Sequence, residues 1–176
     1  MTQAILKPET ELEVGLEYTM SIESIGGSPE YESISKDNNI TGESEPAIYK
    51  VVAEKDFTKP QLSSQPKELK KTFVNAGCGP SIHIVFSNPL KDNSDVIIKT
   101  TVKNLRTGIE TAYYIQPDKD TIKVGHDMCS GAFSFDEGDN YEVEFSFMDA
   151  SGNFTFWTGE RIKFTAPTSP NEHSEK

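Results

Sequence analysis

The chain has 176 residues, a formal net charge of −11 and a hydrophobic content of only 35%. This acidity excludes nucleic acid as an expected partner and disfavours anionic membrane surfaces, because both attract Lys and Arg. No run of residues approaches the 18 or so apolar positions of a transmembrane helix, so no membrane insertion is expected.

Residues 1–58 are predicted to form an N-terminal β segment. Residues 12–24 alternate apolar and polar side chains, with Tyr18, Met20 and Ile22 on one face. The 22 largely polar residues 26–47 predict a long loop before the strand-like run 48–54. Three interpretations are open: extra strands such as a hairpin on the main domain, part of a truncated neighbouring domain, or strands donated to a neighbouring subunit.

Residues 59–167 are predicted to form the main domain, an all-β antiparallel sandwich of about seven strands. Along 140–149 every second residue is apolar, as in a sheet with one buried face. Similar β-rich runs occur at 81–87, 95–104, 109–116, 120–125 and 160–166. Only residues 65–73 could form a helical turn. The tail, residues 168–176, has no large apolar side chain and is expected to be disordered.

Two segments of the chain repeat one pattern. LEVGLEYTMSI, from Leu12, and FDEGDNYEVEF, from Phe135, both read apolar-x-x-Gly-x-x-Tyr followed by alternation, so that Tyr18 corresponds to Tyr141. The pattern resembles the approach to strand F in fibronectin type III and bacterial Ig-like domains, which implies that both tyrosines make a structural corner hydrogen bond. DASGN, at 149–153, resembles their F–G turn. KPQLSSQP and IHIVFSNPL are similar to the A and B strands of surface-layer-type Ig-like domains.

This resemblance covers about residues 59–167 and brings no catalytic residues with it, since such modules serve as spacers, adhesion units or ligand platforms. Two departures separate the chain from antibody domains. Val143 stands where those domains place a cysteine, and the only Trp, Trp157, lies near the end of the domain instead of in strand C. We therefore expect an Ig-like module without enzymatic activity.

Each of the two cysteines lies near a histidine: Cys78 precedes His83, and His126 precedes Cys129. If the strand before strand F is 120–125, the cysteines lie at the same end of an Ig-like sandwich. If that strand is 131–135, they lie at opposite ends. A disulfide would stabilise the fold by about 4 kcal/mol and imply an oxidising compartment. Two separate reduced cysteines, and a Zn or Cu site made of all four side chains, remain alternatives.

The alternation within 81–87 turns His83 and Val85 away from the core side, which weakens a four-ligand metal cage. An acidic loop also places Asp37, Asn39, Thr41 and Gly42 at EF-hand-like positions. Ile48 then takes the place of the required acidic ligand, so calcium binding is not expected.

Three aromatic residues gather near an expected end loop of the sandwich and could stack on a sugar: Phe154, Phe156 and Trp157. Burial in the core is the competing interpretation, and the exposure of Trp157 distinguishes the two. No signal peptide is visible, and we expect a fragment of a longer extracellular, cell-surface or periplasmic protein.

The expected function is that of a non-catalytic, secreted or cell-surface bacterial module that binds a protein ligand in adhesion, spacing or assembly. The alternatives are a carbohydrate-binding module that uses the aromatic residues near Trp157, and a periplasmic Zn- or Cu-binding sandwich that uses the Cys/His set. A virion decoration protein also fits the composition.

Overall fold

The computed structural model describes residues 8–23, 31–33, 35–37, 43–54, 56–77, 79–128, 130–131 and 133–169. Within these ranges the protein is all-β, with antiparallel sheets and no helix that could cross a membrane. The chain divides into two compact units. We call Ile5–Asp56 the N-terminal unit, and Phe57–Lys176, grouped with Met1–Ala4, the sandwich unit.

The described part of the N-terminal unit contains three antiparallel pairs of short strands: β1 with β6, β2 with β3, and β4 with β5. Their bounds are β1 (Glu17–Thr19), β2 (Ser21–Glu23), β3 (Tyr31–Ser33), β4 (Ser35–Asp37), β5 (Ser44–Pro46) and β6 (Ile48–Lys50). The single strand expected at 12–24 is therefore interrupted at Met20, and the expected loop 26–47 contains three strands. Ladder hydrogen bonds join backbone groups, so polar residues can form them without an apolar face.

The sandwich unit contains two main sheets. The five-stranded sheet has the order β12-β11-β14-β15, with β16 also paired to β14, and the three-stranded sheet has the order β13-β9-β8. A short pair, β7 with β10, accompanies them. The bounds are β7 (Gln61–Leu62), β8 (Glu68–Ala76), β9 (Gly79–Ser87), β10 (Leu90–Lys91), β11 (Val96–Asn104), β12 (Glu110–Ile115), β13 (Thr121–His126), β14 (Asn140–Asp149), β15 (Phe154–Thr155) and β16 (Ile162–Thr165).

The core of the sandwich unit contains side chains from both sheets. Phe86 of β9 packs edge-on against Phe145 of β14, with ring centroids 5.4 Å apart, and against Phe164 of β16 at 6.0 Å. A fully buried side chain of this size contributes about 1.5–3 kcal/mol. The other buried members are Ile84, Val96, Ile98, Val102, Tyr113, Ile122, Val124, Tyr141, Val143, Phe147 and Ala166. The alternation expected along β14 is thereby confirmed.

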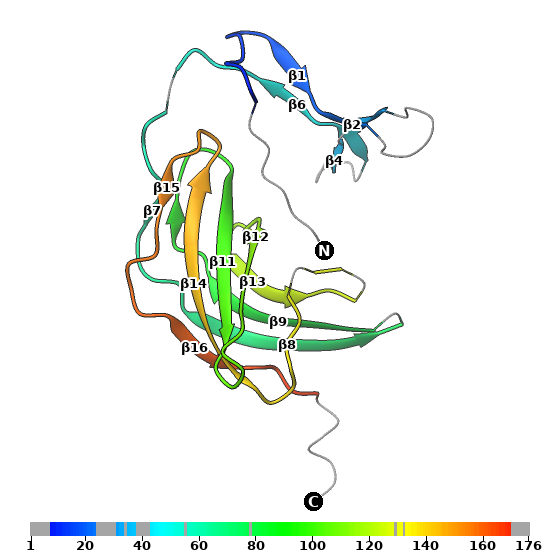
Figure 1. Cartoon of the computed structure of the whole chain (residues 1–176), viewed down its shortest axis with the longest axis vertical. Coiled ribbons are helices and arrows are strands. Elements are labelled where there is room, and N and C mark those ends of the chain that lie inside the picture. Colours follow the sequence, from blue (N-terminus) through cyan, green and yellow to red (C-terminus); the bar gives the residue numbers. More distant parts are fainter. Residues whose placement is uncertain are drawn as a thin grey trace, which may run out of the picture. The chain divides into compact units, whose positions relative to one another are not determined.

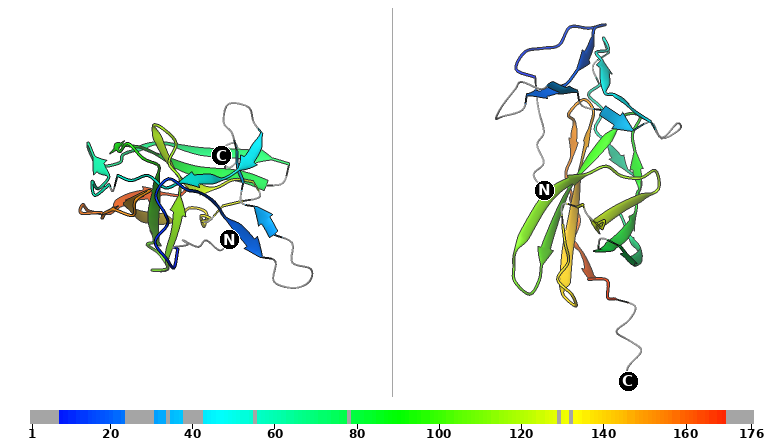
Figure 2. Two further views of the ribbon diagram at one scale, coloured as in Figure 1. Left: turned by 90° about the horizontal axis from the view of Figure 1, so that it is seen from above. Right: turned by 90° about the vertical axis from the view of Figure 1, so that its right-hand side faces the viewer.

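The strands of the two sheets do not run alongside one another. Figure 1 shows β8 and β9 running across the long strands β11 and β14, and Figure 2 shows this crossing from above. Aligned β-sandwiches keep their strand directions within about 30°, so the crossing differs from the Ig-like expectation.

The predicted helical turn at residues 65–73 is wrong. These residues lead into and form part of β8, which pairs with β9 in a long hairpin that closes at Ala76 and Gly79. Leu and Lys favour a helix in isolation, but tertiary pairing overrides this weak preference.

Val85 of β9 lies on the outer side of the sheet, as predicted, yet it is buried. Its register neighbours are Lys70 and Lys123, whose aliphatic stems can cover an apolar residue.

Of the two runs that could form the strand before β14, residues 120–125 and residues 131–135, the first forms β13. Residues Thr121–His126 pair antiparallel with β9, as expected for the run 120–125. In the alternative run 131–135, Gly131 makes only an isolated bridge to His126, and the described residues form no strand.

The segment that leads into the sandwich unit is bonded at two places. The carbonyl oxygens of Thr58 and Pro60 accept hydrogen bonds from the Asn153 amide and the Thr155 hydroxyl, at the β15 side of the five-stranded sheet. Directly afterwards β7 pairs with β10, which continues from β9. This segment therefore joins the β15 end of the five-stranded sheet to the strand that follows β9.

Candidate functional site

The turn before β14 is shaped by a glycine and a tyrosine. The Asp139 N–H donates to the Asp136 carbonyl (3.3 Å), and Gly138, at the third position of this turn, has a φ of 72°. A positive φ at that position alone is the signature of a type II turn, which favours Gly. The buried Tyr141 side chain closes the corner, because its hydroxyl accepts a hydrogen bond from the Asp136 N–H at 2.7 Å.

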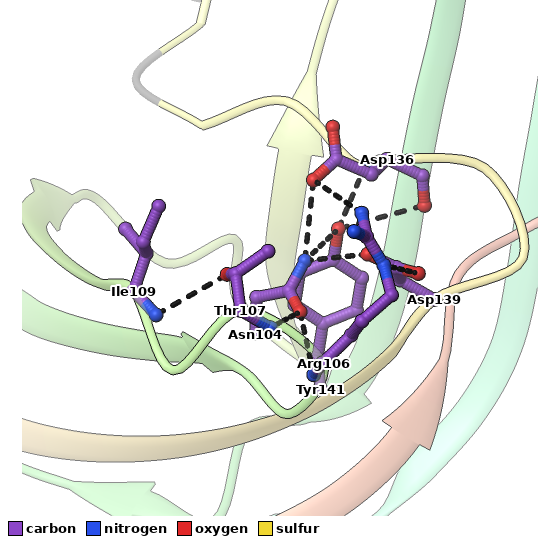
Figure 3. A network of polar contacts seen from close by, with 7 residues as sticks. All are labelled: Asn104, Arg106, Thr107, Ile109, Asp136, Asp139 and Tyr141. Atoms are coloured by element: carbon purple, nitrogen blue, oxygen red, sulfur yellow. Dashed lines mark hydrogen bonds and ion pairs between the residues drawn. The ribbon is translucent and has the colours of Figure 1, made fainter.

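A polar network ties this corner to the turn after β11 (Figure 3). The Asn104 amide nitrogen donates to Asp139 Oδ2 (2.6 Å) and Asp136 Oδ2 (3.2 Å), while its oxygen accepts from the N–H groups of Arg106 and Thr107. Arg106 Nε in turn donates to Asp139 Oδ1 at 2.7 Å. One buried asparagine thus joins two loops that lie 35 residues apart in the chain.

The charges of this network are fixed by its hydrogen bonds. Donation from Arg106 and Asn104 holds the pKa of Asp139 below its usual value, and the same carboxylate raises the pKa of Arg106. Burial raises the pKa of Tyr141. At neutral pH the site therefore contains a carboxylate–guanidinium pair beside a neutral phenol, an arrangement that positions loops.

An open groove of about 650 Å³ lies against the network. Arg106 and Lys163 supply positive charge to its walls, and Asn140 and Thr165 supply polar groups. The full lining is Leu105, Arg106, Gly138, Asp139, Asn140, Tyr141, Lys163, Phe164 and Thr165. Its open form and mixed polarity suit a polar loop of a protein ligand better than an enclosed small molecule.

A second open groove, of about 480 Å³, contains part of the aromatic cluster. Phe156 lines it and is 67% exposed, and its ring stacks on that of Phe154 with centroids 5.5 Å apart. Trp157 also lines it but packs edge-on against Phe145 of the core, and its indole nitrogen is buried without a hydrogen-bond partner among the described residues. The exposed stacking surface is therefore Phe156. The full lining is Lys59, Pro60, Gln61, Leu62, Gln65, Thr155, Phe156, Trp157, Thr158 and Gly159.

The expected Cys/His set is described only in part, since Cys78 and Cys129 lie outside the described residues. His83 Nε2 lies 3.8 Å from Asp127 Oδ1, and the His126 ring nitrogen Nδ1 lies 3.1 Å from the Asp127 carbonyl oxygen. The described part of the chain brings no three His, Cys, Asp or Glu side chains together as metal ligands. Of the calcium candidates, Asp37 lies in β4, Ile48 is exposed in β6, and Asn39, Thr41 and Gly42 fall outside the description.

The N-terminal unit contains the same corner. The Leu16 N–H donates to the Glu13 carbonyl (3.3 Å), Gly15 has a φ of 87°, and the Tyr18 hydroxyl accepts from the Glu13 N–H at 3.0 Å. These three features correspond to the bond from the Asp139 N–H to the Asp136 carbonyl, the positive φ of Gly138, and the bond from the Asp136 N–H to the Tyr141 hydroxyl.

The pairing of the following strand is repeated as well. Tyr18 pairs with Tyr49 across β1 and β6, as Tyr141 pairs with Phe164 across β14 and β16. Two residues after Tyr49 and after Phe164, a backbone N–H donates to the carbonyl of the residue that follows the turn glycine: Val51 to Leu16 (3.0 Å) and Ala166 to Asp139 (2.9 Å). Residues 12–18 with 48–51 are therefore a structural copy of 135–141 with 163–166.

Comparison with protein-family models, curated proteins and solved structures finds no match to this chain.

The sequence predicts one of the two grooves better than the other. The aromatic cluster could be predicted from the sequence FTFW at residues 154–157. The Asn104 network could not be predicted, because its members are far apart in the sequence. Its local signal is an Asn at a strand end before a Thr-Gly turn, which is typical of side-chain-to-backbone bonding, as in the Arg106 N–H bond.

Proposed function

We propose that the protein is a non-catalytic Ig-like module of a secreted or cell-surface protein, acting in adhesion, spacing or assembly. The observation that carries this proposal is the duplicated corner, in which two turns and two strand pairings make the same hydrogen bonds. Repetition of one β element within a chain supports a modular architecture, in which function depends on the surfaces that the fold presents.

The strand order supports the Ig-like assignment. If β9, β11, β13, β14 and β16 are taken as strands B, C, E, F and G, then B pairs with E, and F lies between C and G. The corner tyrosine then stands at the start of strand F, as in that family. The crossing of the two sheets is a difference from the aligned Ig-like sandwich, and in this respect the chain is a variant of that architecture.

The proposal is tested with the full chain coupled to beads. Bead-to-bead aggregation measures assembly, and adhesion to surfaces coated with mucin, collagen or fibronectin measures ligand binding. We expect at least one of the two, reversibly and without chemical change of the surface. Beads that neither aggregate nor adhere would contradict both the assembly and the adhesion role.

Carbohydrate binding is the second candidate, favoured by the exposed Phe156 ring beside a groove that also offers the amides of Gln61 and Gln65. An exposed aromatic face with nearby amide donors is suited to stacking on a sugar and bonding its hydroxyls. On a glycan array, Phe156→Ala should abolish binding. Ile109→Ala, which removes an equally exposed side chain outside this groove, should leave binding unchanged (66% against 67% exposed). Binding that survives Phe156→Ala would exclude this groove.

A further inference from the structure

The two copies of the corner differ in what covers them. In the sandwich unit, Tyr141 is 1% exposed and Phe164 is 5% exposed. Phe135, from the connection between β13 and β14, packs against both rings, and Phe86 of the three-stranded sheet packs against Phe164. In the N-terminal unit the residue equivalent to Phe164 is Tyr49, which is 56% exposed. The β1–β6 pair thus repeats a strand pair that forms part of the core in the sandwich unit, but it leaves Tyr49 exposed.

Further exposed apolar residues lie at the same end of the β1–β6 pair as Tyr49. Val14 and Leu16 flank the turn glycine, and backbone bonds from Gly15 and Leu16 to Val51 place Val52 next to them. We call the four exposed residues Val14, Leu16, Tyr49 and Val52 the N-terminal apolar patch. Exposed apolar residues that gather in this way mark interaction surfaces.

Charge limits what can cover this patch. Residues 5–56 contain twelve Asp and Glu but only four Lys and Arg, so this unit holds most of the net negative charge of the chain. Two N-terminal units would therefore repel each other, as would an anionic membrane. A partner surface must combine apolar residues with positive charge.

Such a surface exists on the sandwich unit. Strand β8 is the edge of its sheet, and among the described strands none pairs with its outer side. Lys67, Lys70 and Lys71 lie on or beside it with a single acidic residue, Glu68, and its Leu69 and Val74 are exposed. We call these lysines together with Leu69 and Val74 the basic edge. A bulge between Glu68 and Lys70 limits regular pairing to the later half of the strand.

We propose that the N-terminal apolar patch of one chain docks on the basic edge of a second copy of this chain. Apolar residues then meet apolar residues, and the carboxylates of the N-terminal unit meet the three lysines. The two surfaces are different, so the contact is heterologous, and a dimer keeps one free apolar patch and one free basic edge. The assembly consequently grows head to tail, as an open chain or a closed ring. This inference rests on the assembly role proposed above.

The test uses sedimentation velocity of the full chain over about 5–300 µM, at about 50 and about 500 mM NaCl. The wild-type chain should associate as its concentration rises, and salt should weaken the association by about tenfold. Leu16→Asp should raise the dissociation constant at least tenfold, because it buries a carboxylate in the contact. This substitution suits the backbone, since the equivalent position in the second corner is Asp139. The double substitution Lys70→Glu, Lys71→Glu should have the same effect, and Ile109→Asp is the control that leaves association intact.

A mixture of the two defective proteins separates this arrangement from others. The Leu16→Asp protein keeps an intact basic edge, and the lysine variant keeps an intact patch. Together they should form a 1:1 dimer that does not grow further. A wild-type chain that stays monomeric overturns the proposal, as does association that persists in both variants or a mixture that stays monomeric. Bead adhesion to mucin, collagen or fibronectin would in each case leave the adhesive role standing.

Discussion

The hydroxyl of Tyr141 offers the sharpest test of the corner, because the chain contains a matched control for it. Tyr141→Phe removes the acceptor of the 2.7 Å bond from the Asp136 N–H, and a longer contact with the Asn104 amide at 3.4 Å. The ring is buried, so water cannot easily replace the hydroxyl. A partly buried donor left without a partner costs about 1–3 kcal/mol, and we expect about 1.5 kcal/mol here.

Tyr18→Phe removes the same bond in the N-terminal unit, where the contact is exposed. Water can there replace the hydroxyl, so we expect less than about 0.5 kcal/mol. Urea unfolding followed by the fluorescence of Trp157 reports only on the sandwich unit, because this is the only Trp of the chain and it packs on Phe145. With a slope of about 1.5–2 kcal/mol per M, Tyr141→Phe should lower the midpoint by about 0.8–1 M, and Tyr18→Phe should leave it unchanged. Equal midpoints for wild type and Tyr141→Phe would refute the reasoning.

Three further outcomes are expected. Thiol titration of the unfolded, non-reduced chain should find no free thiol. Gly79 and Met128, the chain neighbours of Cys78 and Cys129, lie close together, because a Cβ added to Gly79 would lie 3.3 Å from the Met128 carbonyl oxygen. Two free thiols would exclude the disulfide. Burial holds the pKa of His83 below its ordinary 6.5, against the attraction of Asp127, so the unfolded chain takes up the proton more readily. Stability should then fall as pH drops below about 6.5, and His83→Gln should flatten this dependence in urea unfolding; identical profiles would contradict it. Arg106→Ala should destabilise the sandwich unit at neutral pH, and the difference from wild type should shrink as falling pH protonates Asp139; a difference that does not change with pH would show that the ion pair is not its cause.

Much of the sandwich could be predicted from alternation alone. Residues 140–149 show one apolar face that is buried in full, because a strand between two neighbours with one covered face must keep period two. Strand β8 was missed because an edge strand needs no such pattern. Its lysines suit solvent on the open side and resemble a helical sequence.

The candidate sites were predictable only where the signal is local. Gly15 and Gly138 indicate the two corners in the sequence, because a type II turn needs a positive φ at one fixed position and glycine adopts it most easily. The burial of Trp157 and the joining of Asn104 to Asp139 depend on contacts between distant segments, and no short pattern contains them.

The double attachment of the leading segment has a mechanical consequence. Tension applied at Phe57 would meet first the Thr58 and Pro60 carbonyl bonds beside β15, and then the β7–β10 pair. The load would therefore be carried at two places before β8 is pulled. The Thr58 bond is exposed and the Pro60 bond is partly buried, so under tension we expect the Thr58 bond to open first, before the Pro60 bond and before the aromatic core.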